Sequence, residues 1–224
     1  MTSNKPLLHP DTRREMILPE TPLPDIRWIA GGSCGGKTIC SENISRRMGV
    51  EVYHADDRRQ IHYEKADFEL FPTLSRKIDW PDFFNSEVPE IFNFWESLCF
   101  ERMEMILQDL SEINSAKPVI VEGVYAYPEL IQTFTPNAPS VFLFAERDFL
   151  KSCYYGREST LWMEELFNRC EEPEEAKLQW LAKWIPIDDD YKKRVASLGY
   201  PCLEASKTTD WQVYEAEIEQ LLML

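Results

Sequence analysis

A glycine-dense segment near the N-terminus holds the residues whose types and spacing point most clearly to chemistry. Residues 31–38 read GGSCGGKT and match the pattern G-x-x-x-x-G-K-[ST]. Glycines let the backbone turn tightly, so that several N–H groups point inward at phosphate groups, and a helix beginning there adds partial positive charge. We expect Lys37 to reach the β- and γ-phosphates of a nucleotide and the Thr38 hydroxyl to bind Mg²⁺. The alternative is a glycine-rich turn that only links a strand to a helix. The residues expected to contact the nucleotide are Gly31, Gly32, Ser33, Cys34, Gly35, Gly36, Lys37 and Thr38.

Carboxylates follow two apolar segments further along the chain. Asp56 and Asp57 come after the segment 50–55, and Glu122 closes the segment 118–123. In a parallel sheet, the carboxyl ends of strands lie at the edge where ligands bind. We therefore predict Asp56 as the general base that accepts the proton of a phosphate acceptor, with Asp57 as the alternate. Glu122 is predicted to hold Mg²⁺ together with Thr38. Each acid could instead cap a turn.

Arginines after the fourth apolar segment supply candidates for neutralising the transferred phosphoryl group. Arg157 is the first choice, and Arg147 and Arg169 are the others. Each alone could equally be a surface cation or a cation at a helix C-terminus.

Candidates for the acceptor side lie between the second apolar segment and a long helical pattern. We name Asp57, Arg58, His62 and Arg102 as substrate candidates, and Arg59 could line the same pocket. His62 could also be an ordinary surface histidine. Several aromatic residues could stack on an aromatic acceptor but are more often core: Trp80, Phe83, Phe84, Phe92 and Trp95.

The elements that must position these residues alternate between short apolar runs and longer amphipathic ones, which predicts a parallel sheet covered by helices. Strands are predicted over 26–30, 50–55, 118–123, 140–146 and 200–205. Helices are predicted over 37–48, 86–113, 150–156, 161–169, 173–184, 188–198 and 211–222, the last with a cap at Thr209 or Asp210.

The chain length predicts one domain. We expect an N-terminal extension over 1–24 and a single domain over 25–224, with a substrate-side loop at about 56–90 and a lid at about 155–190. The substrate-side loop has little period of its own, and a loop this long inside a compact domain is usually functional.

Composition narrows the classes of partner. The net charge of -15 disfavours a nucleic-acid partner, because such binding depends on clustered Lys and Arg. Residues 1–24 lack an apolar signal region, and no run is long enough to span a bilayer. The six cysteines have no paired spacing and fit the reduced thiols of a cytoplasmic protein. The oligomeric state stays open, with a homodimer as one option.

A phosphate-binding loop does not by itself define a reaction. The chain lacks an Asn/Thr-Lys-x-Asp guanine reader, which disfavours a switch GTPase. It also shows neither an acidic pair at the end of the Walker B strand nor a distant arginine finger, which disfavours a remodelling ATPase. The segments GGSCGGKT, YHADD and VIVEG, in this order and spacing, resemble the P-loop nucleoside-kinase superfamily. The resemblance is to uridine-kinase-like enzymes, and is closer still to uncharacterised bacterial P-loop kinase-like proteins.

This resemblance covers roughly residues 26–160 and implies an α/β three-layer P-loop kinase fold with a five-stranded parallel sheet in the order 2-3-1-4-5. It also implies ATP with Mg²⁺ and a small-metabolite acceptor. It places Lys37 on phosphate, Thr38 on the metal, Asp56 as the base and Glu122 near the metal. The aromatic pair that follows the Asp in uridine kinases is absent, since Asp57, Arg58 and Arg59 come next. A nucleoside is therefore only one candidate acceptor.

The sequence as a whole predicts a cytoplasmic ATP-dependent phosphotransferase that acts on a small-molecule hydroxyl. The alternatives are a regulatory ATPase that signals to a partner protein through residues 58–90, and a module without catalytic activity.

Overall fold

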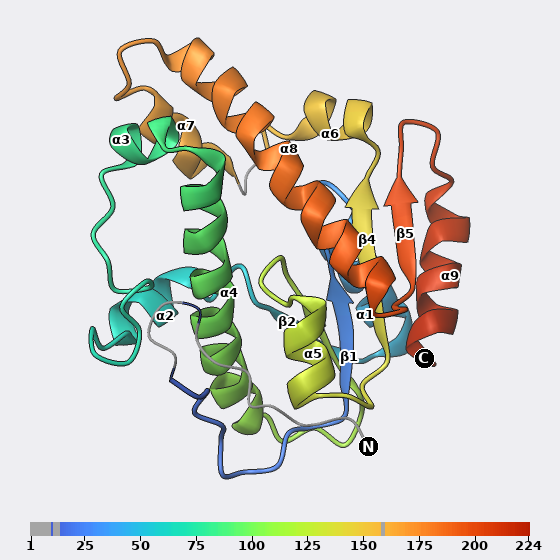
Figure 1. Cartoon of the computed structure of the whole chain (residues 1–224). Helices are drawn as coiled ribbons and strands as arrows, with labels where there is room; N and C mark the ends of the chain where they lie inside the picture. Colours follow the sequence, from blue (N-terminus) through green and yellow to red (C-terminus); the bar gives the residue numbers. More distant parts are fainter. Residues whose placement is uncertain (1–9, 11–13, 158–159) are drawn as a thin grey trace.

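A sheet of five parallel strands in the order β2-β3-β1-β4-β5 runs through the centre of the protein (Figure 1). The computed structural model describes residues 10, 14–157 and 160–224. The order and the parallel pairing confirm the sheet expected from the sequence. The strands are β1 (Ile26–Ala30), β2 (Glu51–His54), β3 (Val119–Glu122), β4 (Ser140–Ala145) and β5 (Cys202–Ala205).

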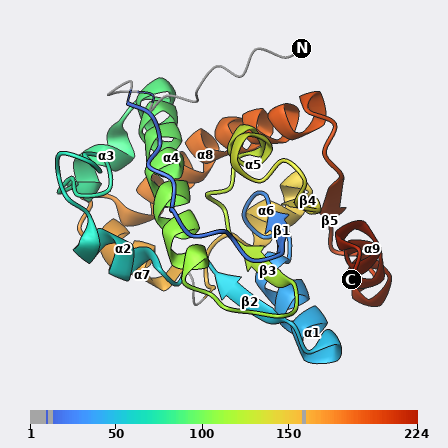
Figure 2. The ribbon, with the colours of Figure 1, turned by 90° about the horizontal axis from the view of Figure 1, so that it is seen from below.

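Helices cover both faces of this sheet. Seen from below, α1 (Lys37–Met48) and α9 (Trp211–Leu222) lie on one face, and α4 (Val88–Ser111), α5 (Pro128–Phe134) and α8 (Pro173–Ser197) lie on the other (Figure 2). The other helices are α2 (Arg59–Lys65), α3 (Trp80–Asn85), α6 (Arg147–Cys153) and α7 (Leu161–Phe167). Among the described residues, no helix combines the length and the apolar content that crossing a membrane requires.

Alternating side chains of the strands build a core on each face. Trp28 and Phe142 are buried in the core formed with α4, α5 and α8. Their chain neighbours Ile29 and Leu143 are buried in the core formed with α1 and α9. Because successive side chains of a strand point to opposite faces, a strand covered on both sides is apolar throughout. This is why the strands were visible in the sequence as continuous apolar runs.

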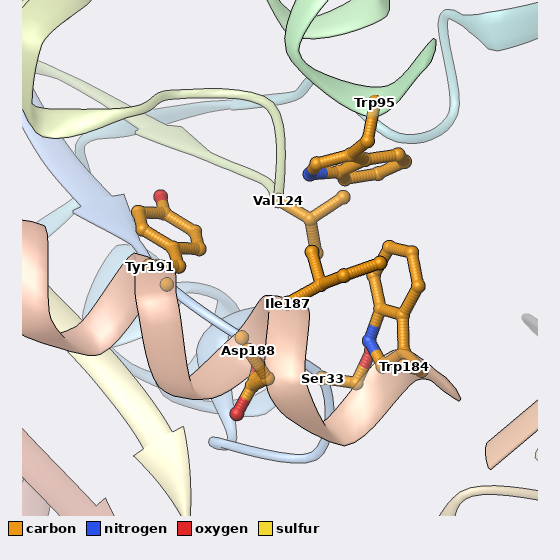
Figure 3. Close-up of a pocket in the computed structure, with 9 residues that line it drawn as sticks. Ser33, Trp95, Val124, Trp184, Ile187, Asp188 and Tyr191 are labelled. Atoms are coloured by element: carbon orange, nitrogen blue, oxygen red, sulfur yellow. The ribbon is translucent and has the colours of Figure 1, made fainter. Parts of the chain in front are cut away.

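Helix α8 differs from the prediction of two helices over 173–184 and 188–198. The structure contains one helix of 25 residues with Pro186 inside it. A proline removes one backbone hydrogen bond. Here Leu181 and Ile187, on either side of it, are both buried, so the two halves stay packed as one element. The predicted break is therefore wrong. One continuous helix instead carries Asp188 to the carboxyl ends of the strands (Figure 3).

The region between β2 and α4 is more ordered than its lack of periodicity indicated. It contains the short helices α2 and α3. The loop between them is fastened to α4, because the fully buried carboxylate of Glu101 accepts the backbone N–H groups of Thr73 at 3.0 Å and Leu74 at 2.7 Å. Glu101 thus holds the loop that the sequence predicts to face the substrate. Its chain neighbour Arg102 is also fully buried.

The described part of the N-terminal segment lies against α4. Arg14 Nη1 is 2.8 Å from the carboxylate of Glu104, and Met16 is buried in the core. Residues 1–9 and 11–13 of the expected extension, and residues 158–159 of the expected lid, lie outside the described residues. The division into an extension over 1–24 and a domain over 25–224 stays a prediction.

Candidate active site

The loop 31–38 connects β1 to α1 at the carboxyl edge of the sheet. Its backbone takes positive φ angles at Gly31 (118°), Cys34 (62°) and Gly36 (86°). A Cβ on Gly31 would lie 2.2 Å from the carbonyl oxygen of Leu143, so the close approach of the loop to β4 requires glycine there. Gly36 caps α1 without a side-chain hydrogen bond, which leaves the first N–H groups of this helix available to a ligand.

Lys37 is buried and lies within the loop. Its Nζ donates a hydrogen bond to the carbonyl oxygen of Gly32 at 2.5 Å, so the ammonium group is folded back over the loop backbone. Burial raises the pKa values of two carboxyl groups that approach from different elements, Asp56 after β2 and Asp188 on α8, and the charge of Lys37 opposes both rises. Lys37 therefore lies where it can act on anionic groups from both directions.

Glu122, at the end of β3, joins the loop to the neighbouring strand. Its carboxylate is buried, with Oε2 accepting the Thr38 hydroxyl at 3.3 Å and Oε1 lying 2.8 Å from His54 Nδ1. The hydrogen bond to Glu122 raises the pKa of His54. The structure thus brings the two predicted metal ligands, Thr38 and Glu122, into direct contact.

His54 was not singled out in the sequence, although a signal for it exists. In the parallel pairing of β2 with β3, His54 is the register partner of Glu122. Once strand 2 is placed beside strand 3, the last residues of the two strands must face each other.

Asp56 lies beside the end of β3, and Asp57 is exposed. Asp56 Oδ1 accepts the backbone N–H of Val124 at 3.3 Å. Burial, and then the charge of Glu122, raises the pKa of Asp56, and the charges of Lys37 and Arg102 oppose that rise. Of the two acids that follow β2, Asp56 is therefore the one that lies near Lys37 and Glu122.

Arg102, on α4, also reaches this point. Its side chain is fully buried, and Nη2 donates a hydrogen bond to the carbonyl oxygen of Ala55. The guanidinium carbon lies 4.5 Å from the centre of the Tyr125 ring. Arg102 thus contacts both segments that flank Asp56, the end of β2 and the loop after β3.

Arg58 and His62 are held in a cluster of their own on Asp109. Asp109 Oδ2 is 3.1 Å from Arg58 Nε, 2.9 Å from His62 Nε2 and 2.7 Å from the hydroxyl of Tyr53. These hydrogen bonds outweigh burial and hold the pKa of Asp109 well below its usual range. His62 is only 1% exposed, so the alternative of a surface histidine is wrong. The cluster fastens α2 to the C-terminal end of α4.

The three candidate arginines after β4 lie in different settings. Arg157 lies near Cys34 of the loop, since its charge opposes the rise that burial causes in the pKa of this thiol, and its Nε donates to the Tyr154 carbonyl at 3.1 Å. Arg147 pairs with Asp189 of α8 at 2.7 Å. Arg169 is exposed after α7. Only Arg157 of these three shows an interaction with the loop among the described residues.

Helix α8 covers the first half of the loop (Figure 3). A cavity of about 10 Å³, room for roughly one water molecule, separates the two. Asp188 is so close that a Cβ on Gly32 would lie 2.0 Å from its Oδ1, and burial raises the pKa of Asp188 to about 6. The cavity is lined by Gly31, Gly32, Ser33, Trp95, Val124, Trp184, Ile187, Asp188 and Tyr191.

The predicted aromatic candidates divide between this cavity and the core. Trp95 lines the cavity opposite Trp184 (Figure 3), whereas Phe84 stacks on Phe167 at 4.2 Å between ring centres. The remaining candidates, Trp80, Phe83 and Phe92, pack against the same core cluster as Phe84.

Helix α9 covers the second half of the loop. The Tyr214 hydroxyl donates to the Gly35 carbonyl at 3.2 Å, and a Cβ on Gly36 would lie 2.6 Å from the Trp211 ring. Asp210, one of the two predicted caps, accepts the N–H groups of Gln212 and Val213 at the start of this helix. Neither aromatic contact was visible in the sequence, because nearly 180 residues separate Tyr214 from Gly35.

Comparison with known proteins places this arrangement in a fold class. A shikimate kinase from Bacteroides thetaiotaomicron superposes with a TM-score of 0.52 and 15% identity, over 89% of this chain and 98% of that one. The chain has the fold of a P-loop kinase. A shikimate kinase from Acinetobacter baumannii, in complex with shikimate, superposes over 90% of this chain and 93% of that one, with 17% identity and a lower TM-score of 0.46.

A curated protein shares local sequence with the chain. The 2-phosphoglycerate kinase of Methanopyrus kandleri is 30% identical over 131 residues, which are 54% of this chain and 38% of that protein. The match therefore spans about two fifths of the curated relative. No protein-family profile matches the chain.

Proposed function

We propose that this chain, which has a P-loop kinase fold, is an ATP-dependent phosphotransferase. Its acceptor is the hydroxyl group of a small molecule, with a nucleoside or related metabolite as one option. The observation that carries the proposal is the position of Glu122. Its carboxylate contacts Thr38 of the glycine loop on one side and His54 at the end of β2 on the other. Two residues after His54, Asp56 accepts the backbone N–H of Val124, in the loop after β3. A phosphate loop, a metal ligand and a base are thereby held at the ends of three adjacent strands.

The loop and α1 are suited to the phosphates of ATP. The uncapped N–H groups at the start of α1 and the positive φ angles of the loop direct backbone donors toward an anion. Lys37, which now donates to the Gly32 carbonyl, has the reach to transfer its hydrogen bond to a phosphate oxygen. Arg157 would add a second positive charge near Cys34.

The oxygen atoms of Thr38 and Glu122 fit a magnesium ion. Both are hard ligands, and they lie 3.3 Å apart. Among the described residues, no group of three or more His, Cys, Asp and Glu side chains could hold a metal ion. Mg²⁺ is usually held in such sites by one or two protein ligands together with substrate phosphates, where it neutralises the charge of the transferred group. Thr38 and Glu122 would fill these two protein positions.

Asp56 is suited to accept the proton of the acceptor hydroxyl. Burial and Glu122 raise its pKa and so strengthen it as a base, while the nearby charges of Lys37 and Arg102 favour the ionised form. The hydrogen bond from the Val124 N–H fixes one of its oxygens and leaves the other for a substrate.

The relatives support the reaction class. The fold neighbour and the curated protein with shared local sequence are both named as kinases of small molecules. Their substrates differ from each other, so the acceptor must be found by experiment.

The test measures ATP consumption by the purified chain with Mg²⁺, first alone and then with separate pools of metabolites. A phosphotransferase should consume ATP much faster with one pool and should convert a component of that pool to its phosphate ester, visible by mass spectrometry. Equal rates with every pool, and release of inorganic phosphate only, would instead favour a regulatory ATPase and reject the proposal.

A further inference from the structure

We propose that the acceptor carries an anionic group, a carboxylate or a phosphate, and that the guanidinium of Arg102 binds this group beside Asp56. This inference rests on the proposed phosphotransfer function and names the chemical class of its acceptor. It starts from a positive charge inside the protein whose hydrogen-bonding capacity is mostly unused.

Arg102 is fully buried on α4. Of its nitrogen atoms, Nη2 donates to the Ala55 carbonyl, whereas Nε and Nη1 have no hydrogen-bond partner among the described residues. None of the ion pairs found in the described part of the chain includes this guanidinium. Buried charges are normally paired, because removing an ion from water without a counter-charge is costly. The free edge of Arg102 is therefore suited to a planar, bidentate anion.

The surroundings place this edge in the acceptor region. Ala55, whose carbonyl Arg102 contacts, directly precedes Asp56 in the chain. The charge of Arg102 lowers the pKa of Asp56 and opposes the rise that burial causes in the pKa of Tyr125. An anion bound to Arg102 would thus hold the rest of its molecule, with the hydroxyl, close to the proposed base.

A second cation lies near Tyr125. Arg59 lies on α2 with its guanidinium carbon 4.2 Å from the centre of the Trp162 ring on α7, and its charge also acts on the Tyr125 hydroxyl. Arg58, by contrast, is already paired with Asp109. The acceptor region therefore holds two cations, Arg102 and Arg59, although the chain as a whole carries a net charge of -15.

The competing explanation is that Arg102 only supports the backbone, through Ala55 and the Tyr125 ring. The two explanations differ in their consequences for Arg102→Met. A supporting arginine should lower the melting temperature strongly when replaced. A binding arginine with an unpaired buried charge should give a variant of equal or higher melting temperature, because the volume is kept and the charge is removed.

The direct experiment titrates the full chain with simple anions while AMP-PNP and Mg²⁺ saturate the phosphate loop. Inorganic phosphate and acetate are the two probes, and the melting temperature is the readout. One of them should raise the melting temperature of the wild-type chain at millimolar concentration. Stabilisation by phosphate would indicate an acceptor with a phosphate group, and stabilisation by acetate an acceptor with a carboxylate. Arg102→Met should abolish this stabilisation, and Arg102→Lys should weaken it about ten-fold or more, because lysine lacks the planar fork.

Arg27→Gln is the matched control. Arg27 also has a buried Nε without a partner, but it is paired with Asp25 at the opposite end of the sheet. This variant should respond to the anion as the wild type does. No stabilisation of the wild type by either anion, or the same stabilisation in Arg102→Met and Arg102→Lys, would overturn the inference.

The outcome is separable from that of the proposed function. Anion binding that depends on Arg102 in a chain that transfers no phosphoryl group would preserve the binding site and reject phosphotransfer. Transfer to an uncharged acceptor, with unchanged KM in the Arg102 variants, would preserve phosphotransfer and reject the anionic acceptor.

Discussion

The nucleotide side and the acceptor side of the candidate site are built in different ways. The nucleotide side is one segment of eight residues, 31–38, held between α8 and α9. The acceptor side collects Asp56, Arg59, Arg102 and Tyr125 from the turn after β2, α2, α4 and the loop after β3. We propose that this local segment binds the phosphates of a nucleotide, a ligand that many proteins share. On the acceptor side, each residue comes from a different element and can be substituted separately, so this surface can determine which acceptor binds.

The largest effect is expected on the nucleotide side, from Lys37→Met. Loss of the buried ammonium group should lower ATP turnover by about 10³-fold or more, because Lys37 is the residue proposed to bind the β- and γ-phosphates. Lys193→Met on α8 is the control, since Lys193 is exposed. ATP turnover that survives in Lys37→Met would show that the loop is not the nucleotide site.

The next effect should be confined to the acceptor side. Asp56→Asn should lower phosphoryl transfer by about 10²- to 10³-fold and leave ATP affinity within a few-fold, because the amide cannot accept the proton. Asp57→Asn, at the exposed neighbouring position, should be close to wild type. ATP affinity is measured by calorimetry, and transfer by product formation. If Asp57→Asn proved to be the inactive variant, the base would have to be reassigned.

Asp188 on α8 provides a pH test of the nucleotide side. Burial raises the pKa of Asp188 from 3.8 to about 6, so the folded state binds this proton more tightly than the unfolded state does. Stability should therefore fall as the pH rises from about 4 through 6. Asp188→Asn removes the burial cost of the charge and should raise the free energy of unfolding at pH 7.5 by about 1 to 3 kcal/mol.

The gain from Asp188→Asn should be small near pH 4 and should disappear near about pH 3, below both pKa values, where the wild-type carboxyl group is protonated in the folded and the unfolded state. Denaturant unfolding at several pH values measures it. A gain of the same size at pH 4 and pH 7.5 would show that ionisation of Asp188 is not its cause.

The smallest effect is expected from Tyr214→Phe. The substitution removes the hydrogen bond to the Gly35 carbonyl and should cost about 1 kcal/mol of stability. ATP affinity should fall by less than ten-fold, and the ratio of transfer to hydrolysis should not change, since Tyr214 contacts the glycine loop and not the residues proposed to bind the acceptor. Tyr200→Phe, at a half-buried position before β5, is the control. A changed ratio in Tyr214→Phe would show that the two sides are coupled through α9.

The difference between a contiguous nucleotide side and a composite acceptor side also explains which features the sequence could predict. The loop, the strands, and the positions of Lys37, Thr38 and Glu122 followed from local patterns, because strands buried on both faces are continuous apolar runs and the loop is contiguous. The order of the strands in the sheet followed only from the resemblance to P-loop kinases. The sequence favoured Asp56 and kept Asp57 as the alternate. In the structure, Asp56 contacts the Val124 N–H and Asp57 is exposed.

Residues that approach from distant elements were missed for a physical reason. Asp188 reaches Gly32 because α8 continues through Pro186, where a local rule predicts a break. Tyr214 and Trp211 reach the loop because α9 packs beside α1, which no local pattern records. The free edge of Arg102 depends on the absence of partners in three dimensions, so the sequence placed Arg102 among four acceptor candidates without an order.

The most direct measurement follows the γ-phosphoryl group itself. The wild-type chain, Asp56→Asn and Asp57→Asn are incubated with Mg²⁺, a metabolite extract and ATP labelled in its γ-phosphoryl group, and the labelled products are separated. We predict label on one small molecule with the wild type and Asp57→Asn, and almost none on it with Asp56→Asn. Label found only in inorganic phosphate, at the same rate in all three proteins, would contradict the assignment of a phosphotransferase.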